Sequence, residues 1–154
     1  MTLRVFIQNE AGSNRKHYHD EKTLELKRVV DVSRPYPFPY GFILDTTAAD
    51  GWNVDCYVIT RQPLTTGQIV ECEPIGLMEQ VEDGAEDHNV LATLVGETGT
   101  VDAGLQETLR AFSLTVFGHI EGKRMIVGRF LGPREAEAHI RAHRDGNALA
   151  PEAR

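Results

Sequence analysis

Several features are scarce in this chain of 154 residues, and each scarcity excludes a class of protein. Basic residues number 16 against 23 acidic ones, which leaves a formal net charge of −7. Because nucleic-acid phosphates are bound by basic surfaces, we expect no nucleic-acid partner. No stretch approaches the roughly 20 apolar residues that a membrane-spanning helix needs, so we expect no membrane association. The N-terminal segment MTLRVFIQNE lacks a secretory pattern, which favours a cytoplasmic location.

Cysteine is also rare, with Cys56 and Cys72 as the two examples. Neither lies in a spacing that would hold zinc, and a cytoplasmic protein keeps its thiols reduced, so we expect two free thiols. Internal repeats and low-complexity stretches are absent, and 41% hydrophobic with 25% charged residues is typical of a globular protein. We therefore predict a single domain over residues 1–143, followed by a C-terminal tail over 144–154.

Strand-like segments fill the first part of the chain. Runs such as LRVFIQN, VDCYVIT, GQIVECEPIGLMEQ and NVLATLVGE are rich in β-branched residues and are separated by turn signals. Between two of the strand-like segments, RPYPFPYG places prolines at alternate positions. Proline lacks a backbone donor and biases the preceding residue to extended geometry, so this segment is predicted to be a stiff surface loop.

Helix-like segments follow. Beyond Asp102, apolar residues recur every three or four positions, at Leu105, Leu109, Phe112 and Val116, which predicts an amphipathic helix. The segment GKRMIVGRFLG is a late strand, and GPREAEAHIRAH, with its early proline, predicts a C-terminal helix. The pattern therefore indicates an α+β fold in which a mostly antiparallel barrel or curled sheet precedes two helices.

Acidic residues gather beside the predicted strands. Asp50 and Asp55 flank one turn, and the cluster EDGAED occupies residues 82–87. Carboxylates at the mouth of a barrel can hold a hard cation such as Mg²⁺, which prefers oxygen ligands. The alternative is that they are ordinary solvated acids in turns, and the residues alone leave both interpretations open.

A family resemblance favours the metal-binding interpretation. The segments AGSNRKHYHD, PYGFI, DGWNVD, PIGLMEQVEDGAEDHNVLA and the closing EAEAHI occur in the order seen in soluble inorganic pyrophosphatases of the β-barrel type. The resemblance runs from about Leu3 to His143. It implies a five-stranded closed barrel of the OB type with two flanking helices. It also implies hydrolysis of pyrophosphate with several Mg²⁺ ions, with Mn²⁺ as the other candidate cation, and assembly into a homo-oligomer, commonly a hexamer.

The resemblance assigns metal ligands residue by residue. Asp50 and Asp55 match the two flanking aspartates of the family's signature loop, which bind a metal. Asp87 matches a third aspartate that shares the same ion. Glu82 stands where the family has another metal-binding aspartate, and it is one methylene longer.

The resemblance also assigns substrate contacts. Lys16 and Arg28 align with a lysine and an arginine that grip phosphate, and Tyr40 matches a tyrosine of the substrate cavity. Together with Asp55, these three residues are the predicted catalytic set. Trp52 lies between the two signature aspartates, where its indole can stack on a substrate ring.

The sequence departs from the family pattern at several of the remaining positions. Trp52 replaces a third signature-loop aspartate that helps to deprotonate the attacking water, and an indole cannot accept that proton. Neutral or apolar residues replace charged or polar ones at further positions, namely Gln8, Tyr18, Asn89, Val116 and Phe117. The cavity is therefore predicted to be less charged and more aromatic than that of the family.

Histidines are the remaining candidates for chemistry. His17 and His19 alternate with Lys16 and Tyr18 along a predicted strand, so both are expected to point away from a cavity that Lys16 faces. His88, next to Asp87, is a candidate substitute base, although a strand would turn it away from the side of Asp87.

Three functions fit these residues. The first is a divalent-metal-dependent hydrolase of a phosphoanhydride, weak on plain pyrophosphate because the base is missing. The second is an enzyme of the same fold acting on an organic phosphate, phosphonate or carboxylate, since fold does not fix function. The third is a non-catalytic homologue.

Overall fold

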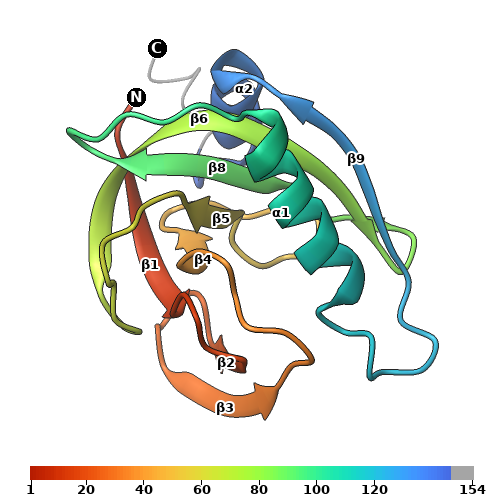
Figure 1. Cartoon of the computed structure of the whole chain (residues 1–154). Helices are drawn as coiled ribbons and strands as arrows, with labels where there is room; N and C mark the ends of the chain where they lie inside the picture. Colours follow the sequence, from red (N-terminus) through yellow and green to blue (C-terminus); the bar gives the residue numbers. More distant parts are fainter. Residues whose placement is uncertain (147–154) are drawn as a thin grey trace.

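The structure, a computed structural model, describes residues 1–146 (Figure 1). Five strands close into a barrel, because the first of them pairs with both the second and the last of the ring. In the order of pairing, the ring consists of β1 (Leu3–Asn9), β4 (Tyr40–Ile43), β5 (Asp55–Val58), β8 (Asn89–Leu94) and β6 (Ile69–Glu82). The predicted α+β fold, dominated by a closed five-stranded barrel of the OB type with two helices, is confirmed.

The pairings within the barrel are antiparallel except between β5 and β8, which run parallel. The parallel register sets Asp55 beside Asn89. Two chain segments that carry predicted site residues therefore lie next to each other, although more than thirty residues separate them in the sequence.

Three further strands and a short one extend this core. The strands β2 (Arg15–His19) and β3 (Leu26–Asp31) form a separate hairpin, which lies below the barrel in Figure 1. At its far end, the long strand β6 pairs with the two-residue β7 (Ala85–Glu86) and with β9 (Met125–Leu131). Its length of 14 residues lets β6 contact β1 at one end and β9 at the other.

Two helices pack on the outside of the barrel. The helix α1 (Ala103–Thr115) begins at Asp102, whose Oδ1 accepts a hydrogen bond from the Leu105 backbone N–H at 2.9 Å. The helix α2 (Pro133–His143) begins at its proline, as predicted, and the Glu135 side chain accepts from the Gly132 backbone N–H at 2.8 Å. Figure 1 shows α1 crossing the front of the sheet and α2 lying beside the upper part of β6.

Two apolar clusters form the core. The first fills the barrel and includes Ala136 and Ile140 of α2. The second lies under α1, where Leu109 and Phe112 pack against strand residues such as Tyr57. Because this second cluster also carries tyrosine side chains, the packing of α1 fixes the wall of the cavity described below.

Three further expectations from the sequence concern the cysteines, membrane-spanning helices and the C-terminal tail. Cys56 and Cys72 are both buried and free, as expected. No helix within residues 1–146 is long and apolar enough to cross a membrane. In the predicted tail, the Asp145 backbone N–H donates to the Asp45 carbonyl at 2.9 Å, and the rest of the tail, residues 147–154, lies outside the described residues.

Candidate active site

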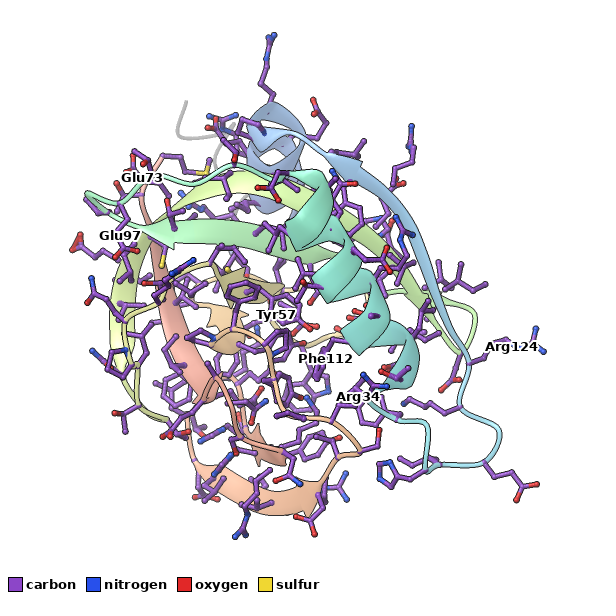
Figure 2. The ribbon with its side chains drawn as sticks, viewed as in Figure 1. Arg34, Tyr57, Glu73, Glu97, Phe112 and Arg124 are labelled. Atoms are coloured by element: carbon purple, nitrogen blue, oxygen red, sulfur yellow. The ribbon has the colours of Figure 1, made fainter. Side chains whose placement is uncertain are left out.

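A cavity of about 470 Å³ lies between barrel strands, the β2–β3 hairpin and α1. Phe112 of α1 and Tyr57 of β5, labelled between the helix and the barrel in Figure 2, both line the cavity, and their ring centres lie 6.5 Å apart. Every residue that the sequence analysis assigned to the site lines this cavity: Lys16, Arg28, Tyr40, Asp50, Trp52, Asp55, Glu82 and Asp87. The fold therefore brings the predicted set together from segments that are distant in the sequence.

Asp55 and Asp87 both line the cavity, and the negative charge of Asp87 acts on Asp55. Two hydrogen bonds with Gln80 hold Asp87 in place. The Asp87 backbone N–H donates to the Gln80 carbonyl at 2.9 Å, and Gln80 Nε2 donates to Asp87 Oδ2 at 3.2 Å. Burial, followed by the negative charges of Asp87 and Glu21, raises the pKa of Asp55 well above its usual range.

Asp50 lies apart from this pair, in the turn that precedes β5. It is exposed, and its Oδ1 accepts a hydrogen bond from the Trp52 backbone N–H at 2.9 Å. Within residues 1–146, no three acidic, histidine or cysteine side chains are grouped so that they could hold a metal ion. Asp50, Asp55 and Asp87 thus line one cavity without forming a preformed cluster of ligands.

Glu82 has a counter-ion that the sequence analysis missed. The Nζ atom of Lys123 lies 3.4 Å from Glu82 Oε2 and 3.6 Å from Asp83 Oδ2. The same Nζ lies 4.8 Å from the centre of the Phe117 ring. Lys123 therefore places a positive charge beside Val116 and Phe117, where the sequence analysis expected apolar residues in place of polar and charged ones. It arrives from the loop before β9, whose path no sequence motif predicts.

Lys16 and Arg28 form the cationic side of the cavity. Arg28 and Tyr18 are opposite each other in the hairpin, and the guanidinium carbon lies 4.4 Å from the centre of the Tyr18 ring. Lys16 Nζ lies 5.0 Å from the same ring centre and 5.1 Å from that of Tyr40, distances at which a cation is attracted to a ring face. The positive charge of Lys16 acts against the raised pKa of Asp55, so cation and carboxylate lie within electrostatic reach.

Aromatic side chains form the wall beneath Lys16. The Lys16 ammonium donates to the Tyr36 hydroxyl at 3.4 Å. The Tyr36 ring lies 5.5 Å from Tyr40 and 4.7 Å from Phe112, and Tyr40 lies 4.8 Å from Tyr57, measured between ring centres. Burial raises the pKa values of Tyr36, Tyr40 and Tyr57, so these phenols stay protonated. This wall can donate hydrogen bonds to an anion, and it can contact an apolar group.

Glu21 is an acidic residue of the cavity that the sequence analysis overlooked. It lies in the turn between β2 and β3, and its Oε1 accepts a hydrogen bond from the Asn53 backbone N–H at 2.9 Å, 32 residues further along the chain. Burial raises the pKa of Glu21 to about 7; the Asn53 hydrogen bond opposes this shift, and the negative charge of Asp50 adds to it. Since the contact is long-range, no local pattern in the sequence signals it.

The structure shows where His19 and His88 lie relative to the cavity. The prediction that His19 points away from the cavity is wrong, because a register shift between Tyr18 and His19 breaks the strand alternation and His19 lines the cavity. His88 points elsewhere: its Nε2 lies 3.0 Å from a Glu86 carboxylate oxygen, and its ring centre lies 5.5 Å from that of His139. His88 is therefore not placed to act on water inside the cavity.

The polar atoms of the cavity fit a hard divalent cation. Its acidic residues present carboxylate oxygens, which Mg²⁺ and Mn²⁺ prefer as ligands. Asn89 is only 2% exposed and lines the cavity, and within the described part of the chain its Oδ1 has no hydrogen-bond partner. A buried oxygen without a partner is costly, so Asn89 Oδ1 indicates that a bound water, cation or substrate satisfies it.

Comparison with known proteins agrees with this geometry. The model of the family described as inorganic pyrophosphatase matches residues 5–143. Inorganic pyrophosphatase of Nanoarchaeum equitans is 29% identical over 92% of this chain and 94% of its own, and that of Aquifex pyrophilus is 32% identical over 90% and 85%. The crystal structure of an inorganic phosphatase from Anaplasma phagocytophilum superposes with a TM-score of 0.83 at 26% identity, covering 92% of this chain and 91% of that one. The chain belongs to the inorganic pyrophosphatase family.

Proposed function

We propose that this protein hydrolyses a phosphoanhydride bond with the help of a divalent cation, Mg²⁺ or Mn²⁺. The observation that carries the proposal is that Asp55 and Asp87, whose carboxyl groups are close enough to act on each other, line the same cavity as Lys16 and Arg28. Carboxylates on one side and fixed cations on the other suit a phosphate group whose charge is shared between a metal ion and basic side chains. The membership of the family supports the same reaction.

The residues of the cavity would have different roles, set by the chemistry of their side chains. Asp50, Asp55 and Asp87 would hold the cation, which when bound supplies charge neutralisation at the phosphoryl oxygens and a more acidic water. Lys16 and Arg28 would bind the phosphate that leaves. Tyr40, whose phenol stays protonated, would donate a hydrogen bond to a phosphate oxygen.

The positive charge of Lys123 argues against Glu82 as a metal ligand. Its carboxylate already faces Lys123 Nζ at 3.4 Å. A cation would have to compete with that ammonium group for the same oxygen. We propose instead that Glu82 and Lys123 act as a pair, in which Glu82 orients the lysine toward the substrate.

We infer that plain pyrophosphate is a poor substrate and that a phosphate with an organic part is a better one. Trp52 presents an indole with 48% of its surface exposed, and it lines the cavity. The rings of Tyr36 and Tyr40 line the same cavity. A small, highly charged pyrophosphate leaves these rings without a contact, whereas a flat or apolar group can pack against them.

A phosphate-release assay across substrates tests both statements. Inorganic pyrophosphate, nucleoside diphosphates, simple organic diphosphates and phosphonates are compared, each with Mg²⁺, with Mn²⁺ and with a chelator. We expect cation-dependent release that is faster with an organic diphosphate than with pyrophosphate. Faster turnover of pyrophosphate than of every organic compound would refute the inference about Trp52, and no release from any compound would favour a non-catalytic homologue.

Trp52→Asp is the matched variant for the same assay. It adds a carboxylate between Asp50 and Asp55 and removes the exposed indole. A positioned general base contributes roughly 10²- to 10⁴-fold to a rate, so we expect faster hydrolysis of pyrophosphate and slower hydrolysis of the organic diphosphate. A variant with unchanged relative rates would show that Trp52 does not decide the substrate.

Assembly into a homo-oligomer, a hexamer by family resemblance, is a further part of the proposal. Apolar side chains with about half of their surface exposed lie on several elements, among them Ile126 of β9 and Leu114 of α1. Burial of such side chains between subunits would remove apolar surface from water. Light scattering during gel filtration measures the mass directly.

A further inference from the structure

Resting on the proposed function, we propose that Glu21 supplies a carboxylate oxygen to the divalent-cation site. The β2–β3 hairpin would thereby deliver an acidic ligand to the turn at residues 50–55, at the point where Trp52 offers none. Glu21 would act directly on the cation or on a water bound to it.

The first support is the place where Glu21 is held. Its Oε1 accepts from the Asn53 backbone N–H, which follows Trp52 in the turn between Asp50 and Asp55. Asn53 is 3% exposed, and its Nδ2 donates to the Ile43 carbonyl at 2.9 Å, so the anchor is itself fixed. Among the hydrogen bonds and ion pairs of residues 1–146, none engages the second oxygen of Glu21, which leaves it available.

The second support is the rigidity of the turn that carries Glu21. Asp20 Oδ1 accepts from the backbone N–H groups of Lys22 and Thr23, each at 3.0 Å. Lys22 Nζ donates to the Thr46 carbonyl and to Thr47 Oγ1, both at 2.8 Å. The turn is thus closed on itself by Asp20, and Lys22, the residue after Glu21, ties it to the segment after β4. A ligand must be held in place before the ion arrives, and this turn provides that.

The third support is the charge around the carboxylate. Glu21 lines the cavity with Asp50 and Asp55, and the negative charges act on one another: that of Asp50 on Glu21, and that of Glu21 on Asp55. Within residues 1–146, none of these three carboxylates takes part in an ion pair. The repulsion between these carboxylates is relieved when a cation or a proton is bound among them.

An observation independent of the acids points to a ligand at the same place. Asn89 lies opposite Asp55 in the β5–β8 register, and its buried Oδ1 lacks a partner in the described part of the chain. Two segments distant in the sequence therefore both present an unengaged oxygen to the cavity, one from Glu21 and one from Asn89. A hard cation with its shell of water fits this arrangement.

Isothermal titration with Mn²⁺ tests the proposal without any substrate. The wild-type chain, Glu21→Gln and the control Glu73→Gln are compared at one pH. Glu73 is an exposed carboxylate at the edge of the barrel, distant from Tyr57 and Phe112 in Figure 2. Loss of a group that holds a metal or its water commonly weakens binding roughly 10- to 100-fold, which we expect for Glu21→Gln alone.

A second variant separates loss of a ligand from distortion of the hairpin. In Glu21→Gln combined with Trp52→Asp, the turn itself provides the missing carboxylate, and we expect Mn²⁺ affinity to return to within a few-fold of wild type. Equal affinity in wild type and Glu21→Gln would overturn the role of Glu21 and leave the proposed function standing. A double variant as weak as the single one would also overturn it. A wild-type chain that binds no Mn²⁺ would refute the proposed function as well.

Discussion

Replacing Glu21 with glutamine should make the metal-free protein more stable at alkaline pH. In the folded chain, burial raises the pKa of the Glu21 carboxyl to about 7, from an ordinary value of 4.5. Between these two values the folded state binds more protons than the unfolded state. The free energy of unfolding therefore falls as the pH rises from 4.5 through 7, and it levels off above that range.

The size of this effect follows from the difference between the two pKa values. A change from 4.5 to about 7 corresponds to ~3 kcal/mol between the folded and unfolded states when the carboxyl is fully ionised. Glutamine keeps an oxygen that can accept from the Asn53 N–H but carries no charge. We therefore expect Glu21→Gln to be more stable than wild type by up to about 3 kcal/mol at pH 8, and by little near pH 4.5.

Urea unfolding in the presence of a chelator measures this difference. Wild type, Glu21→Gln and Glu73→Gln are compared at pH 5 and pH 8, with the midpoint and slope of each transition fitted separately. Glu73→Gln should follow wild type at both values. If Glu21→Gln unfolds with the wild-type free energy at pH 8, the Glu21 carboxylate is not held in a desolvated position beside Asp50.

Three further expectations concern metal binding, acid stability and packing. Asp55→Asn should lose most of the rise in melting temperature that millimolar Mg²⁺ gives the wild type, since a ligand at about 100 times its Kd adds roughly 2.7 kcal/mol; a full shift in the variant would contradict its role. Burial lowers the pKa of His139 from 6.5 to about 4, so stability should be lost as the pH falls from 6.5 toward 4, by about 1 kcal/mol once solvent screening of this partly buried ring is allowed for. His139→Gln should abolish that part of the loss in urea unfolding at pH 5 against pH 7.5. Gly41→Ala should destabilise the barrel by about 3 kcal/mol or more, because its Cβ would overlap the Phe6 carbonyl, whereas Gly104→Ala in α1 should stabilise by up to about 1 kcal/mol.

The elements of the fold were predictable where the pattern is local. The spacing of Leu105, Leu109 and Phe112 predicted α1, and Asp102 marked its start, because side chains three and four residues apart share one face of a helix. Closure of the barrel was not predictable from periodicity. It depends on the pairing of β1 with β6, whose partners Leu3 and Cys72 are distant in sequence, and it was expected only through the resemblance to a family.

The residues of the site were likewise predictable where a local motif carries them and were missed where a long-range contact does. Asp50 and Asp55 were found because they share a short motif, and Lys16 because its segment matches the family. Glu21 and Lys123 were missed because a hairpin turn and a long loop bring them into the cavity from positions with no motif. The error at His19 had a local cause, since strand alternation fails wherever a bulge adds a residue.

The initial rate of phosphate release with and without Mg²⁺, for wild type and Asp55→Asn, tests the central claim most directly. An organic diphosphate serves as substrate, pyrophosphate is run beside it, and the variant is first shown to be folded. We expect release by wild type that stops with a chelator, and a rate at least about 10²-fold lower in Asp55→Asn. Release that persists at the full rate in the chelator, or in Asp55→Asn with Mg²⁺, would contradict a cation-dependent hydrolysis in this cavity.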